Sequence, residues 1–202
     1  GFVGQLAWAI ENNYFNVYVY DCTKEYGFIP VMTIASAAAA TITTLFMGAV
    51  SDRIGKRKSL ISLGYILWGI SIILFAFLNP KSSFNLVANN IFVAVTMIVI
   101  MDCVMTFFGS TANDAAFNAM VTDHTNDKNR AKVESVLSVL PLLALIAVIL
   151  VAGFFVDVPA GQEKRWEIFF YIFGGITLVI GIVSIFITPK DIKEPNKTEN
   201  YW

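Results

Sequence analysis

The chain has 202 residues, of which 56% are hydrophobic and only 14% are charged, and its mean hydropathy is +0.66. Soluble domains carry about 25% charged residues, so this composition excludes an ordinary water-soluble domain. The formal net charge is −1, and the basic residues are confined to the expected loops. We therefore expect a lipid bilayer around the protein and no nucleic-acid partner.

Long apolar segments divide the chain into regular units. A membrane-spanning helix needs about 20 mainly apolar residues, and polar or proline-containing breaks separate six such segments here. The expected fold is an all-α membrane protein, a six-transmembrane-helix bundle over residues 1–189. The six expected helices cover residues 2–20, 29–50, 59–78, 88–108, 135–156 and 168–188.

The first expected helix carries a polar and aromatic stripe. Trp8, Asn12 and Asn16 recur at helical spacing, and Glu11 lies on the adjoining edge. Such a stripe cannot face lipid, and an ionisable residue within a span indicates a functional site by default. We interpret the stripe as the lining of a water-filled cavity. A hydrogen-bonded cluster between helices is the alternative.

The second expected helix is rich in alanine, serine and threonine, which allow close packing of helices. It leads into a short charged hinge, Gly48-Ala-Val-Ser-Asp52-Arg53-Ile-Gly55-Lys56-Arg57-Lys58, placed between two apolar segments.

The fourth expected helix holds a second buried acid. Asp102 lies in an otherwise nearly all-apolar run, and Thr106 and Ser110 continue its face. Every Lys and Arg falls in a loop or a terminal turn, so none is available to pair with Asp102 within a span. We expect a role in substrate binding or ion coupling. The alternative is a protonated side chain bonded to a backbone carbonyl.

Residues 109–133 are expected to form the only long loop, with a short surface helix over 115–121. Pro141 favours a kink in the fifth helix. Cys22 and Cys103 are read as unpaired small apolar residues. No metal-ligand spacing, nucleophile–base set or phosphate-binding loop appears, so we expect no enzyme activity, no metal and no cofactor.

Basic residues favour one set of loops. The loops and the tail on one side hold ten Lys and Arg, and those on the other side hold four. Because cytoplasmic loops carry the excess, we expect both termini of this segment in the cytoplasm, with the helices in the inner (plasma) membrane. The tail, residues 190–202, has the composition of a solvated linker, and we expect it to join a second bundle.

The hinge at Gly48–Lys58 resembles the signature loop between helices two and three of the major facilitator superfamily of secondary transporters. The resemblance implies that this chain is the N-terminal six-helix half, with a C-terminal six-helix half as partner. It also implies a conformational latch in the hinge. By this resemblance Asp52 would accept hydrogen bonds from a helix start in the other half, and Arg53 would pair with an acid on a neighbouring helix. Gly48 and Gly55 permit close approach and a tight turn, and Lys56 and Arg57 complete the basic run.

A second resemblance concerns Ile100-Met101-Asp102 and the run from Ala119 to Arg130, which are similar to the glycoside–pentoside–hexuronide:cation symporters, the melibiose-permease group. It implies that Asp102 contacts a sugar. The paired carboxylates that hold sodium in that group correspond to Ser36 and Ala40 here, and neither residue is acidic. The coupling cation that we expect is therefore a proton rather than sodium.

These features predict a secondary active transporter that moves a small polar solute, such as a sugar or glycoside, by alternating access. Asp102, Glu11, Asn12, Asn16, Trp8 and Thr106 are the expected substrate and ion-coupling residues. Three alternatives stay open: a transporter of lipid-like cargo, a membrane scaffold or sensor that transports nothing, and a half-size transporter that self-assembles.

Overall fold

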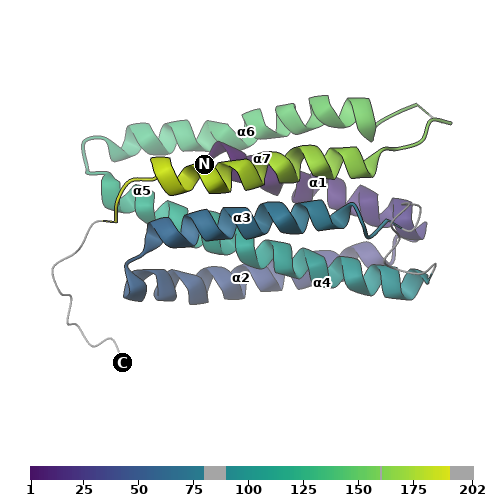
Figure 1. Ribbon diagram of the computed structural model, residues 1–202, viewed down its shortest axis with the longest axis horizontal. Coiled ribbons are helices and arrows are strands. Elements are labelled where there is room, and N and C mark those ends of the chain that lie inside the picture. Colours follow the sequence, from purple (N-terminus) through teal and green to yellow (C-terminus); the bar gives the residue numbers. More distant parts are fainter. Residues whose placement is uncertain (80–89, 160, 192–202) are drawn as a thin grey trace.

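Within residues 1–79, 90–159 and 161–191, which the computed structural model describes, six long helices run alternately from one end of the molecule to the other (Figure 1). The expected all-α, six-helix bundle is confirmed. The expected tail lies outside the described residues from residue 192 onward, as do the first residues of the fourth expected helix. The long helices are α1 (Phe2–Thr23), α2 (Phe28–Ile54), α3 (Arg57–Phe75), α4 (Ile91–Gly109), α6 (Arg130–Phe155) and α7 (Trp166–Ile187).

The fourth helix differs from the sequence expectation. Where a loop was expected from residue 109, the chain continues through a π-helical segment, η1 (Ser110–Phe117), into α5 (Asn118–His124). The polar residues that suggested a loop are held inside the bundle, because Asn113 is 3% exposed and accepts a hydrogen bond from the Tyr65 hydroxyl at 3.0 Å. Residues 91–124 thus form one continuous helix that contains an apolar stretch long enough to cross a membrane.

Length and apolarity mark five of the described helices as able to cross a membrane: α2, α3, the continuous helix 91–124, α6 and α7. Helix α1 has the length but not the hydropathy, because polar residues that include Glu11, Asn12, Asn13 and Asn16 interrupt it. Its packing places it in the bundle with the others, since Ile10, Phe15 and Tyr18 are fully buried.

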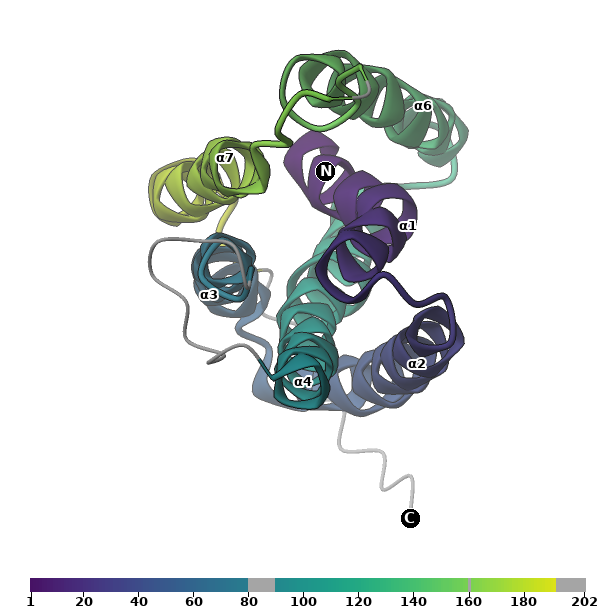
Figure 2. The ribbon, with the colours of Figure 1, turned by 90° about the vertical axis from the view of Figure 1, so that its right-hand side faces the viewer.

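Helices α3 and α7 make the most extensive contact between two helices (Figure 2). Glycines allow this close approach, as small residues commonly do between membrane helices. A Cβ atom built on Gly69 would lie 2.8 Å from the carbonyl oxygen of Gly174, and one built on Gly174 would lie 2.9 Å from the carbonyl oxygen of Gly69. Ser184 donates a buried hydrogen bond of 2.7 Å to Ser62 further along the same contact.

Helix α1 packs against α6 and also contacts α2, α4 and α7, while α2 lies beside α4 and η1 (Figure 2). This arrangement brings one face of α1 opposite α2 and α4. The polar stripe of α1 therefore meets the helix that contains Asp102.

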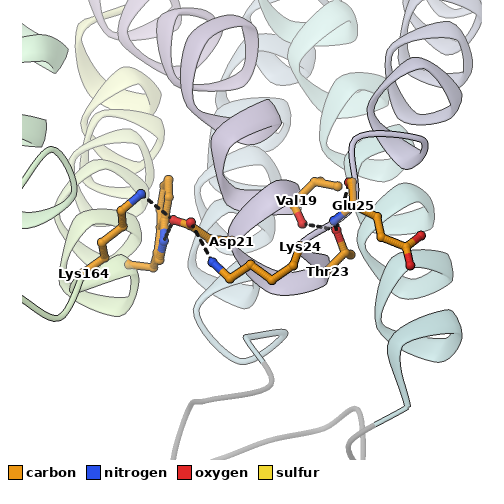
Figure 3. A network of polar contacts seen from close by, with 7 residues as sticks. Val19, Asp21, Thr23, Lys24, Glu25 and Lys164 are labelled. Atoms are coloured by element: carbon orange, nitrogen blue, oxygen red, sulfur yellow. Dashed lines mark hydrogen bonds and ion pairs between the residues drawn. The ribbon is translucent and has the colours of Figure 1, made fainter. Parts of the chain in front are cut away.

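The two ends of the bundle carry different polar networks. At the end where α1 leads into α2, Asp21 accepts ion-paired contacts from Lys164 at 2.7 Å and Lys24 at 3.3 Å (Figure 3). The indole of Trp166 donates a further hydrogen bond of 3.1 Å to the same carboxylate. One acid thus joins the last turn of α1 to the segment that enters α7.

The opposite end contains the turn between α2 and α3, the start of α6 and the end of α7 (Figure 1). Here the carboxylate of Asp191 accepts a hydrogen bond of 2.9 Å from the backbone N–H of Lys58. Because the first N–H groups of a helix have no partner within the helix, Asp191 caps α3. The cap ties the segment after α7 to the start of α3.

Candidate functional site

The polar stripe of α1 lines a cavity between α1, α2 and the continuous helix 91–124. The cavity has a volume of about 310 Å³, within the range of ~300–1,000 Å³ typical of small-molecule sites. Of the residues expected from the sequence, all but Thr106 line it directly. The lining residues are Trp8, Glu11, Asn12, Asn16, Met32, Thr33, Ser36, Ala37, Ala40, Asp102 and Asp114.

Three oxygen atoms form a closed triangle at one side of this cavity. The hydroxyls of Ser36 and Thr106 each lie 2.9 Å from Oε1 of Glu11, and the two hydroxyl oxygens are 2.9 Å from each other. Thr106 is fully buried and Ser36 is 9% exposed. Thr106 therefore belongs to the site without lining the cavity, because its buried hydroxyl bonds to Glu11 on the side away from the cavity.

The other acid expected from the sequence is more deeply buried. Asp102 is 1% exposed and lines the same cavity. Within the described part of the chain, its Oδ1 atom has no hydrogen-bond partner, and neither does Oε2 of Glu11. Both carboxyl groups belong to the lining of the cavity. Buried polar atoms are normally paired, so these two oxygens mark a place where a ligand or a proton can bind.

Asp114 is a site residue that the sequence did not predict. The polar composition of residues 109–133 indicated a loop, whereas η1 carries Asp114 into the cavity. Asp102, Thr106, Ser110 and Asp114 are spaced by four residues, and this spacing was the signal that extended the site. Because an α-helix has 3.6 residues per turn, side chains spaced by four residues shift gradually around its surface. The wider turns of a π-helix reduce that shift.

Exposure shows where the cavity opens. Asn12, Thr33 and Ala37 are exposed at the surface of the bundle, whereas Asp102 and Ser36 are buried at the inner side. The cavity therefore opens on the face formed by α1 and α2. The polar groups on this open face cannot form hydrogen bonds with the hydrocarbon of a lipid bilayer.

The charged hinge lies at the end of α2, away from this cavity. Nε of Arg57 is 2.7 Å from Oδ2 of Asp123, and Nη2 is 3.0 Å from Oδ1 of Asp52. The arginine thus joins the end of α2, the start of α3 and the end of α5. The ion pair with a neighbouring helix, expected of Arg53, is made by Arg57 instead, because Arg57 opens α3 beside α5.

The remaining hinge residues are placed as follows. Gly55 ends α2 with φ 62°, a left-handed conformation that glycine adopts without cost. Arg53 and Lys56 are exposed, and neither makes an ion pair with any other residue that the structure describes. Nothing in the described chain lies within 4 Å of a Cβ atom built on Gly48, so the side of α2 at Gly48 is open.

The fold and the cavity together define a class: a multi-pass α-helical membrane protein with an acidic, small-molecule-sized cavity between its helices. A family model described as Major Facilitator Superfamily matches residues 2–202. The chain therefore belongs to the Major Facilitator Superfamily, a family of secondary transporters. Neither the curated proteins nor the solved structures gave a match.

Proposed function

We propose that the protein is a proton-coupled secondary transporter of a small polar solute, and that the cavity between α1, α2 and the continuous helix 91–124 binds both solute and proton. Sugars and glycosides are the solute class that the resemblance around Asp102 implies. Transport follows alternating access, in which this bundle rocks against a second six-helix bundle around a central site. The second bundle covers the open face of the cavity.

The triangle of Glu11, Ser36 and Thr106 is the observation that carries the proton-binding part of this proposal. Three short oxygen–oxygen contacts need three protons to become three hydrogen bonds, and the two hydroxyls supply two. When Glu11 is ionised, both hydroxyls donate to Oε1 and their mutual contact holds no proton. A proton on Oε1 supplies the third and closes the ring, so the site has a place built for one extra proton.

The residues at the usual cation position of the melibiose-permease group support a proton over sodium. By this resemblance the paired carboxylates of that group fall near Ser36 and Ala40, and both of these residues line the cavity. Sodium needs several oxygen ligands converging on one point, whereas a proton needs only one basic oxygen. Glu11 offers such an oxygen.

The Arg57 network supports a latch at the cytoplasmic end. Arg57 holds Asp52 on the surface, where 67% of its side chain stays exposed and its carboxylate can reach a helix start on a second bundle. The N-terminus of a helix favours an acid by about 0.3–1 kcal/mol, and more when the pair is partly buried. Contacts of this size suit an equilibrium that must reverse in every transport cycle.

Proton flux in liposomes tests the proposal. The full-length protein is reconstituted with a pH-sensitive dye inside, and a panel of neutral sugars and of sugars that carry an amine is added outside. We expect at least one sugar to move protons together with itself, and we expect Glu11→Gln and Asp102→Asn to abolish that coupled flux. Asp127→Asn, which removes an exposed acid outside the cavity, is the matched control. If no sugar moves protons, or if the coupled flux survives Asp102→Asn, the proposal is wrong.

A further inference from the structure

We infer that the solute bound in this cavity carries a positively charged amine, and that Asp102 and Asp114 are its counter-charges. The inference rests on the proposed transport function and narrows its substrate class from polar solutes in general to hydroxylated amines. Its starting point is the unbalanced charge of the cavity wall.

Among the residues that the structure describes, the wall contains three acidic residues and no basic one. Glu11, Asp102 and Asp114 line the cavity, and no described Lys, Arg or His lies in its lining. Taking a charge out of water without a partner is strongly unfavourable. Protonation of Glu11, as proposed above, neutralises one acid and leaves two. A ligand with a positive charge is the simplest partner for the remaining pair.

Asp102 gives an independent sign of a missing partner. Its Oδ1 atom is buried and makes no hydrogen bond within the described residues, although the side chain lines the cavity and is 1% exposed. A carboxylate oxygen accepts hydrogen bonds and donates none when ionised. The group that completes it is a donor, and a charged donor such as an ammonium group forms a hydrogen bond roughly twice as strong as a neutral one.

The rest of the wall fits an organic cation better than a metal ion. No group of three or more acidic, Cys or His side chains among the described residues is arranged to hold a metal ion. Trp8 adds an aromatic ring to the wall, and aromatic faces attract organic cations. Asn12 and Asn16 offer amide groups that can bind hydroxyls of the same ligand.

Asp114 is held in place for this role by η1. The side-chain amide of Asn113 donates a hydrogen bond of 3.1 Å to Oδ1 of Asp114, and the carbonyl oxygen of that amide accepts the Tyr65 hydroxyl at 3.0 Å. This chain of contacts connects Asp114 to the core of α3. The acid is therefore positioned rather than mobile.

Equilibrium binding of two matched polyols tests the inference. N-methylglucamine and sorbitol share a six-carbon hydroxylated chain, and only the first carries an amine that is charged at pH 7. Binding of each to the full-length protein in detergent is measured by calorimetry. We expect N-methylglucamine to bind about tenfold or more tightly than sorbitol, the size of one charge-assisted hydrogen bond. We also expect Asp102→Asn and Asp114→Asn each to remove most of that preference, and Asp127→Asn to keep it.

Equal binding of the two polyols, tighter binding of sorbitol, or no binding of N-methylglucamine at millimolar concentration overturns the inference. So does a preference that both cavity variants retain. Proton flux separates this failure from failure of the proposed function. If only neutral sugars drive proton flux, the proposed transport function holds and the inferred amine substrate is wrong. If N-methylglucamine binds but no solute drives proton flux, the cation site holds and proton-coupled transport is wrong.

Discussion

Arg57 and Asp123 lie on helices that are far apart in the sequence, and Nε of Arg57 is 2.7 Å from Oδ2 of Asp123. Nη2 of the same arginine is 3.3 Å from Oδ1, so both carboxylate oxygens of Asp123 are used. The pair fixes the first turn of α3 against the end of α5, at the end of the bundle that also holds Asp52.

A double-mutant cycle measures this pair. We expect Arg57→Gln and Asp123→Asn to show a coupling of about 1 kcal/mol, the upper range for partly exposed ion pairs, because the Arg57 side chain is only 17% exposed. The free energy of unfolding in detergent is the readout. Arg53→Gln combined with Asp123→Asn is the control and should show almost no coupling. If Arg53 and Asp123 coupled as strongly as Arg57 and Asp123, the assignment of the ion pair to Arg57 would be wrong.

Removal of one hydroxyl from the triangle tests its role in proton binding. Thr106→Val keeps the shape of the side chain and deletes its contacts with Glu11 and Ser36, of which the hydrogen bond to Glu11 alone contributes about 1–1.5 kcal/mol. We expect uptake driven by a pH gradient to fall about five- to tenfold. Thr96→Val makes the same change on the exposed side of α4, where the Thr96 hydroxyl bonds only to a backbone carbonyl. Its uptake should match that of the unaltered protein.

Adjacent glycines in α7 give a matched test of the contact with α3. A Cβ atom on Gly174 would lie 2.6 Å from Cγ1 of Ile73, whereas one on Gly175 would meet open space. We expect Gly174→Ala to lower the free energy of unfolding by about 1–3 kcal/mol through overpacking. Gly175→Ala should leave it unchanged or raise it by up to about 1 kcal/mol. Thermal unfolding in detergent compares the two variants. Equal effects would mean that the close approach of α3 and α7 does not restrict the size of the side chain at position 174.

Cysteine labelling checks the proposed orientation in the membrane. In a background with Cys22→Ser and Cys103→Ser, Asp127→Cys reports on the Arg57 end and Glu163→Cys on the Asp21 end, and both positions are exposed. An impermeant maleimide added to intact cells should label Glu163→Cys and spare Asp127→Cys, because cytoplasmic loops carry the excess of Lys and Arg in membrane proteins. The reverse pattern would invert the topology.

Much of the fold could be predicted from local sequence. The six apolar segments and their polar breaks predicted the bundle, since each spanning helix satisfies its own backbone hydrogen bonds and so appears as an independent run. The polar stripe on α1 and the acid at Asp102 could be recognised for a related reason. A carboxyl group within a span is costly enough to stand out without knowledge of its neighbours.

Local sequence was misleading where polar residues are buried by contacts with other helices. Asn113 and Asp114 suggest a loop by composition, yet Tyr65 on α3 accommodates the first and the cavity accommodates the second. The hinge shows the same limit. Arg53 and Arg57 belong to one basic run, and only the packing of α3 beside α5 gives Arg57 the acidic partner.

The sequence by itself determined that this is a six-helix membrane bundle with two costly acids within its spans, because hydropathy and charge are properties of each residue alone. Only the tertiary structure decided that Glu11 meets Ser36 and Thr106, that Asp114 joins the same cavity, and that Arg57 connects Asp52 to Asp123. These relationships depend on how helices distant in the chain cross and pack. The local sequence around such a side chain does not indicate which distant residue it contacts.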